Sequence, residues 1–274
     1  MTILSIDDLV ASLVTQEMAL VNKTSQSNAA AGVPFSLWNL ASLPAAGAVP
    51  TSADYPTKAT AGALINFTSP GSGEQVRIAR GYMMSSNSAT DIQVHDRLAQ
   101  MAGLSGTVTT AQTVSLALPS NVSADRIGRA DYSEVQWWVE IYTDIGTSAQ
   151  TLTVTYTDVD DNSGQTTTVT IGATTNSQNR RCRLVPIIGA GSEAIKSIQS
   201  VQLGATTGTA GNFGITATRA ITGMSLGLGN SSETYDWAEL LLPIVPENAC
   251  LFIVMFPGTS STGNLTGNFK LVRG

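Results

Sequence analysis

Residues that carry most enzyme chemistry are scarce in this sequence. Its 274 residues include one histidine, His95, and two cysteines, Cys182 and Cys250, and only 12% of the residues are charged. General acid–base, nucleophilic and metal chemistry draw chiefly on His, Cys and clustered carboxylates. We therefore expect a protein that is not an enzyme and that holds no metal or cofactor.

The sequence also lacks excess positive charge and long apolar runs. Fourteen Lys and Arg against twenty Asp and Glu give a net charge of −6, whereas affinity for phosphates comes from clustered Lys and Arg. The longest apolar run, residues 251–256, is too short to cross a bilayer as a helix. Asp7 and Asp8 interrupt the segment where a secretory signal would be apolar. We expect no nucleic-acid or membrane partner, and both cysteines as buried, reduced thiols.

Short runs that alternate between apolar and polar residues fill most of the chain after residue 61. Residues 134–142 alternate with the period of two that is typical of a strand. Residues 151–157 and 166–171 alternate apolar residues with threonines, and the turn-forming residues 158–164 between them predict a β-hairpin. Further strands are predicted at residues 75–83, 92–98, 113–118, 181–188, 197–203, 214–219, 239–245, 249–256 and 269–272. We predict an all-β fold, a jelly-roll-like β-sandwich.

The first sixty residues have a different pattern. Ser5, with Asp8 three residues later, resembles a capping box, and apolar residues at near-helical spacing predict a helix over residues 5–21. Prolines then recur over residues 22–60, which excludes a continuing helix. We predict an N-terminal helix and an extended Pro/Ala-rich arm over residues 1–60, followed by the β-sandwich domain over residues 61–274.

Several large apolar residues are candidates for contacts between subunits. Adjacent tryptophans on a strand must face opposite ways, and residues 251–256 are apolar on both faces. The arm is likewise too apolar for a free linker. Either these side chains pack within their own domain, or they dock on a neighbouring subunit of a homo-oligomer, for which we expect a trimer. The interface candidates are Phe35, Leu37, Trp38, Leu40, Trp137, Trp138, Leu251 and Phe252.

Three polar motifs have structural explanations as well as chemical ones. The acidic turn at residues 158–164 could hold Ca²⁺, but its spacing departs from the EF-hand loop, which favours a solvated hairpin tip. His95 is expected on the polar face of a strand, at the surface or at an interface. A carbohydrate-active enzyme would need two carboxylates about a cleft. The candidates near aromatic residues are Asp131, Glu134, Glu140 and Asp144, and their spacing selects no pair.

Several segments between residues 94 and 219 resemble a group of tailed-bacteriophage virion proteins. They include Val-His-Asp-Arg-Leu at 94–98, Asp-Tyr-Ser-Glu-Val-Gln-Trp-Trp at 131–138, Ser-Val-Gln-Leu at 200–203 and Gly-Thr-Ala-Gly-Asn-Phe-Gly at 208–214. The resemblance implies a structural role in a virion, with the major capsid protein or other virion proteins as partners, and it carries no site residue. We favour a capsid decoration or cement protein; the alternatives are a tail or head-fibre component that binds a receptor, and a carbohydrate-active enzyme or glycan-binding module.

Overall fold

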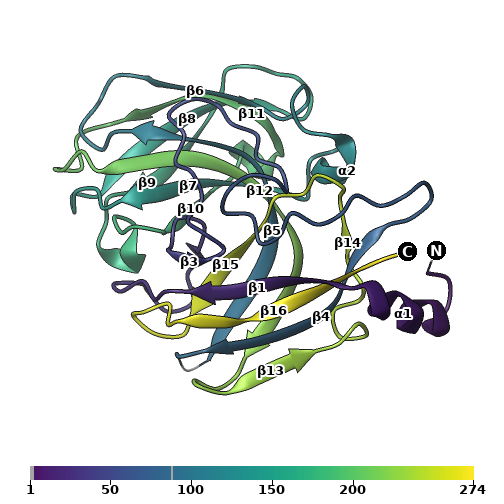
Figure 1. Ribbon diagram of the computed structural model, residues 1–274. Coiled ribbons are helices and arrows are strands. Elements are labelled where there is room, and N and C mark those ends of the chain that lie inside the picture. Colours follow the sequence, from purple (N-terminus) through teal and green to yellow (C-terminus); the bar gives the residue numbers. More distant parts are fainter. Residues whose placement is uncertain (1–2, 88) are drawn as a thin grey trace.

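The structure is a computed structural model that describes residues 3–87 and 89–274 (Figure 1). Its helical elements are α1 (Ile6–Ser12), η1 (Leu13–Thr15), α2 (Ala124–Ile127), η2 (Thr175–Ser177) and η3 (Ala190–Ser192). Its strands are β1 (Glu17–Lys23), β2 (Phe35–Ser36), β3 (Ser42–Leu43), β4 (Val76–Ser85), β5 (Thr90–Leu104), β6 (Gln112–Ala117), β7 (Val135–Thr143), β8 (Gln150–Asp158), β9 (Gln165–Ile171), β10 (Leu184–Ile187), β11 (Ile195–Leu203), β12 (Asn212–Leu226), β13 (Ser232–Tyr235), β14 (Ile244–Val245), β15 (Leu251–Pro257) and β16 (Leu265–Arg273). No helix of the described part is long and apolar enough to cross a membrane.

The described residues form three antiparallel sheets. The central sheet has the order β10-β7-β12-β5-β15-β2. The terminal sheet has the order β13-β4-β16-β1-β3, with β14 also paired to β4, and the Thr-rich sheet has the order β6-β11-β8-β9. The predicted all-β sandwich is therefore confirmed, with two outer sheets packed on one shared sheet.

The long strands β5 and β12 explain this arrangement, because each runs through both halves of the molecule (Figure 1). At one end of β5, Leu98 and Ala99 join the apolar core beneath the Thr-rich sheet. At the other end, Ile92 and Val94 join the core beneath the terminal sheet. One face of the central sheet thus carries two separate cores.

The predicted hairpin at residues 151–171 is confirmed. β8 and β9 pair in register, which places Thr151 opposite Thr170, Thr153 opposite Thr168 and Thr155 opposite Thr166. The alternate residues of β8 are fully buried in the core beneath the sheet. The outer face of this hairpin is therefore a ladder of paired threonines.

The Pro-rich arm covers the second face of the central sheet. Trp38 is 1% exposed and packs with Trp138, Tyr142 and Phe252. The arm folds back over this side chain: Trp38 Nε1 donates a hydrogen bond to the Ala48 carbonyl at 2.9 Å. A Cβ on Gly47 would lie 1.9 Å from the indole ring, so the close approach of the arm requires glycine there.

The helix predicted over residues 5–21 is too long. Ser5 caps α1 as expected, because its Oγ accepts a hydrogen bond from the Asp8 N–H at 3.2 Å. The helix ends at Ser12, however, and residues 17–23 form β1, which pairs along its whole length with β16. Since that partner strand lies near the far end of the chain, local spacing could not indicate it.

The expected division after residue 60 cuts through the fold. β1 lies between β16 and β3 within the terminal sheet, and the arm supplies one wall of the third apolar cluster. The strand predicted at residues 239–245 is also corrected: only Ile244–Val245 pairs, because the Asp236 side chain caps a turn by accepting from the Ala238 N–H at 2.8 Å.

We predict that two truncations separate α1 from the rest of the N-terminal segment. Removing residues 1–60 takes away an interior strand and the cover of the central sheet, so the remainder is expected not to fold. Removing residues 1–15 exposes only the small cluster of Leu9, Ala79 and Val272, so a cooperative thermal transition is expected to persist. Circular dichroism of both purified chains tests this, and a folded 61–274 fragment would contradict it.

Candidate functional site

A fully buried ion pair lies beneath the arm. Arg97 of β5 and Glu140 of β7 approach to 2.5 Å, with side chains 0% and 1% exposed. Glu140 also accepts hydrogen bonds from the Thr216 hydroxyl at 2.7 Å and from the Tyr142 hydroxyl at 3.0 Å. On its other side, Arg97 Nε donates to Gln100 Oε1 at 2.7 Å. The two charges are therefore held by groups from three adjacent strands.

Aromatic rings exclude water from this pair. The guanidinium carbon of Arg97 lies 4.6 Å from the ring centroid of Trp38 and 5.2 Å from that of Phe252. Burial is the largest influence on the pKa of Glu140 and would raise it, but the charge of Arg97 together with hydrogen bonds from Arg97, Ser36 and Thr216 holds that pKa below its usual range. Burial raises the pKa of Tyr142. These groups stay in one protonation state near neutral pH and have no opening to a substrate, so the cluster is structural.

A second buried ion pair lies on the opposite face of β5, where the two cores meet. Arg126 of α2 contacts both carboxylate oxygens of Asp96, at 2.6 and 2.9 Å. The same carboxylate accepts from the Cys250 N–H at 2.8 Å. The pair joins α2 and the loop before β15 to the central sheet, and sequence patterns gave no sign of it because its partners are distant in the chain.

His95 is buried, which corrects the expectation of a surface or interface histidine. It is 0% exposed, with one ring nitrogen 3.1 Å from the Thr218 hydroxyl and the other 2.9 Å from Gln93 Oε1. Burial lowers its pKa to about 3, so the ring is neutral at physiological pH. The sequence places His95 on the polar face of a strand, and in the structure the arm covers that face.

All eight interface candidates lie inside their own chain. Each is at most 8% exposed. Leu251 packs beneath the terminal sheet, Trp137 beneath the Thr-rich sheet, and Trp38, Trp138 and Phe252 in the cluster under the arm. The expectation that these side chains contact another subunit is therefore wrong, and the alternative, that they pack within the domain, is confirmed. The physical reason is that the central sheet is covered on both faces.

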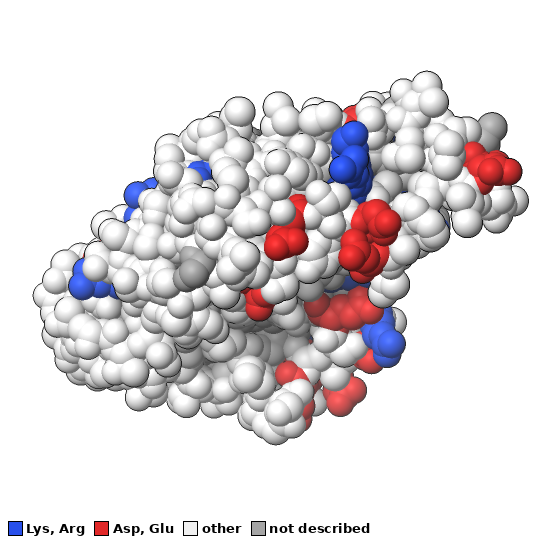
Figure 2. Space-filling view, turned by 90° about the horizontal axis from the view of Figure 1, so that it is seen from below, with Lys and Arg blue, Asp and Glu red and all other residues white. Residues whose placement is uncertain are grey.

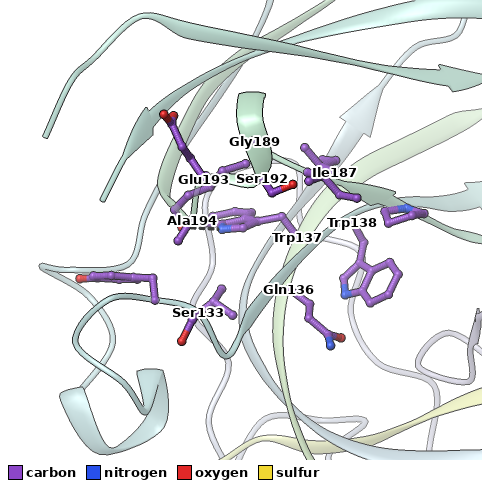
Figure 3. A pocket seen from close by; sticks show the side chains of 14 residues that line it. Ser133, Gln136, Trp137, Trp138, Ile187, Gly189, Ser192, Glu193 and Ala194 are labelled. Carbon is purple, nitrogen blue, oxygen red and sulfur yellow. Dashed lines mark hydrogen bonds between the residues drawn. The ribbon is translucent and has the colours of Figure 1, made fainter. Parts of the chain in front are cut away.

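The clearest concave site is a half-open hollow of about 390 Å³ at the end of β10 (Figure 3). The lining includes Tyr132, Trp137, Gln136, Ser133 and Glu193. They come from β7, from the loop before it and from the turn after β10, and Figure 3 labels Ser133, Gln136, Trp137 and Glu193 among them. Glu193 is the only carboxylate in this lining, so the hollow lacks the second carboxylate of a glycoside hydrolase.

The four carboxylates considered for carbohydrate chemistry have separate structural partners. Asp131 caps its own turn by accepting from the Ser133 hydroxyl at 2.7 Å. Glu134 pairs with Arg219 at 2.8 Å, and Asp144 pairs with Arg180 at 2.9 Å. Glu140 is the buried partner of Arg97 described above. The fold gives each of these groups a different task and forms no common cleft around them.

The acidic hairpin tip forms a closed turn. Asp158 accepts hydrogen bonds from the backbone N–H groups of Asp160 and Asn162, each at 2.9 Å. No group of three or more His, Cys, Asp or Glu side chains that could hold a metal ion occurs in residues 3–87 and 89–274. Cys182 and Cys250 are unpaired and buried, and burial raises the pKa of each thiol to about 12.

The geometry therefore defines a charge-poor all-β protein whose histidine, two thiols and most deeply buried ion pairs lie in its interior. No protein-family model matches the chain, and no curated protein is significantly similar to it. Among solved structures, a mutant VP2 protein of infectious bursal disease virus in derived T=1 particles matches 94% of this chain and 76% of that chain, with 10% identity and a TM-score of 0.19. The structure of the Gx strain of that virus matches 94% and 78%, with 12% identity and a TM-score of 0.20. Likeness at this level carries no argument about fold or function.

We predict that replacing one partner of the Arg97–Glu140 pair destabilises the protein much more than the loss of the pair as a whole would suggest. Arg97→Met leaves the Glu140 charge buried alone, and Glu140→Leu does the same to Arg97, so each is expected to lower the free energy of unfolding by about 3–5 kcal/mol. The double variant Arg97→Met/Glu140→Leu is expected to lose much less than the sum. Urea unfolding of all four proteins measures this coupling, and additive losses would contradict it.

We predict that His95 contributes to acid sensitivity. Its folded-state pKa of about 3 lies below the ordinary value of 6.5, so between these values the unfolded chain takes up a proton that the folded chain does not. The contribution is present above pH 6.5 and falls by up to about 1.4 kcal/mol per pH unit below it. His95→Gln is expected to flatten this part of the stability profile in urea unfolding at several pH values. An unchanged slope would show that the ring is protonated in the folded protein.

Proposed function

We propose that this chain is a structural component of a virion that works by assembly and carries no catalytic site. The observation that carries the proposal is the buried position of the side chains that could do chemistry. The imidazole, both thiols and the most deeply buried ion pairs lie inside the sandwich, where the ion pairs join strands of the central sheet to one another and to α2. What the chain offers to solvent is a surface with few charges, as Figure 2 shows for one face.

The resemblance to tailed-bacteriophage virion proteins supports the same role. It covers residues 94–219, which hold the whole Thr-rich sheet and most of the central sheet from β5 to β12. These are the strands that build the body of the molecule, so the similarity concerns the scaffold. It carries over no site.

Among structural roles we favour a capsid decoration or cement protein, with the major capsid protein as its partner. A single body, low charge and the absence of an extended free strand among the described residues suit a protein that binds to the outside of a shell. The arm is not free to dock on a neighbouring subunit, because it is folded against its own sheet through Trp38 and Gly47. Attachment is therefore assigned to the outer surfaces of the sandwich.

The hollow beside Trp137 favours a second candidate, a receptor-binding tail or head-fibre component. Aromatic side chains beside Ser133, Gln136 and Glu193 suit a neutral, hydroxyl-rich ligand such as a glycan. Gln136→Ala and Glu193→Ala are exposed changes that preserve the fold, and they would abolish glycan binding if this hollow is a receptor site.

Particle composition tests the favoured role. Virions purified from the host that carries this gene are expected to contain the chain in a fixed ratio to the major capsid protein, and labelled antibody is expected to decorate the shell in electron micrographs. Labelling confined to the tail or head fibres would support the second candidate. Absence of the chain from intact virions would overturn the proposal.

A further inference from the structure

The two outer sheets expose opposite kinds of surface. The Thr-rich sheet presents paired threonines. Nearly all the exposed large apolar side chains of the described residues lie instead on the N-terminal segment 3–15, the terminal sheet or the turn at 236–242 beside them; the exceptions are Val108, Ile188 and Leu228. Apolar surface gathered on one face of a soluble protein marks a contact with another protein.

Helix α1 has an apolar stripe that the body of the molecule covers only in part. Leu9 is the buried apolar side chain of this stripe, and it packs on Ala79 and Val272 of the terminal sheet. Ile6 and Val10, one helical turn apart and next to Leu9 on the helix surface, are 61% and 58% exposed. The apolar stripe of a surface helix normally faces a core, so the exposed part of this stripe is open to a contact.

The exposed face of the terminal sheet continues this apolar surface. The register places Met18 beside Lys270, and Leu20 beside Asn268 and then Tyr82, all pointing away from the core. Met18, Leu20 and Tyr82 are 47%, 52% and 41% exposed. We call the set Ile6, Val10, Val14, Met18, Leu20 and Tyr82 the apolar face.

Two hollows, of about 280 and 380 Å³, flank α1, and both are lined by Leu9 and Trp237. The hollows offer space beside α1 to side chains of a partner.

Unpaired charges at the edge of this face are complementary to one another. Arg80 and Lys270 lie directly opposite each other on the outward side of β4 and β16, a repulsive arrangement that an anion would relieve. Among the described residues neither has an ion pair, and neither does Asp7 at the exposed start of α1. The same surface thus carries an acid on the helix and two bases on the sheet.

We propose that the apolar face binds a second copy of this chain, with α1 of each copy against the terminal sheet of the other and Asp7 near the partner's Arg80 and Lys270. Complementary groups on one surface are what a two-fold contact requires, because the same patch meets itself. The choice of a second copy rests on the proposed structural role. The Thr-rich sheet, which packs on the other half of the central sheet, then faces solvent.

Sedimentation velocity of the purified full chain tests this with a matched pair of variants. The unaltered chain is expected to associate at micromolar concentration. Val10→Glu is expected to weaken association about 30-fold or more by burying a charge at the contact. Ile188→Glu, at a side chain that is 61% exposed but lies outside the apolar face, is expected to change nothing. The proposal would be overturned if the two variants had equal effects. It would also be overturned if the unaltered chain were still a monomer at about 100 μM, which is 100 times the ~1 μM working concentration.

A charge exchange separates self-contact from contact with another protein. Asp7→Lys is expected to weaken association, and adding Arg80→Glu is expected to restore it, since the pair is then re-formed across the contact with its signs reversed. Failure of the restoration would overturn the assigned pairing. A chain that is monomeric alone but present in virions at a fixed ratio would keep the structural role and remove the second-copy contact. A chain that self-associates but is absent from virions would keep the second-copy contact and remove the structural role.

Discussion

The buried contact between Arg97 and Glu140 constrains the rest of the molecule. The two residues lie on strands on either side of β12, and the pair is 0–1% exposed. Removing two charges from water costs several kcal/mol per ion, and the pair is tolerated only when its remaining hydrogen-bonding groups find partners and solvent stays out. Thr216, Tyr142 and Gln100 supply partners, so that Arg97 Nη1 is the nitrogen of this guanidinium left without a hydrogen bond, while Trp38 and Phe252 supply the cover.

The cover explains the unusual N-terminal arm. Because the pair lies on the second face of the central sheet, that face needs a layer over it, and the arm provides one without a further sheet. The tight passage of Gly47 over Trp38 fixes the arm in place. The same layer buries His95 and lowers its pKa, and together with the terminal sheet it makes the apolar strand β15 inaccessible on both sides. A strand apolar on both faces is what a doubly covered sheet needs.

With both faces of the central sheet occupied, contacts outside the chain fall to the outer sheets, which differ in kind. One presents hydroxyl groups, which water solvates well, and the other presents apolar side chains that water solvates poorly. The two outer sheets therefore differ in surface chemistry before any partner is present. Assembly through the apolar side leaves the threonine ladder facing solvent, which suits a protein fixed to a particle surface.

The sequence by itself determined the fold class, most strand positions and the β8–β9 hairpin, because alternation with a period of two and turn residues are local signals. It also determined the scarcity of reactive groups, and it indicated that the two tryptophans face opposite ways. Only the tertiary structure decided that residues 17–23 are a strand, because their partner β16 is about 250 residues away. It likewise decided that Trp38, Phe252 and His95 are internal. A sequence looks the same whether a side chain is buried by its own arm or by a neighbouring subunit. The apolar face depends on α1, β1 and β4 meeting in space, and no local pattern encodes that meeting.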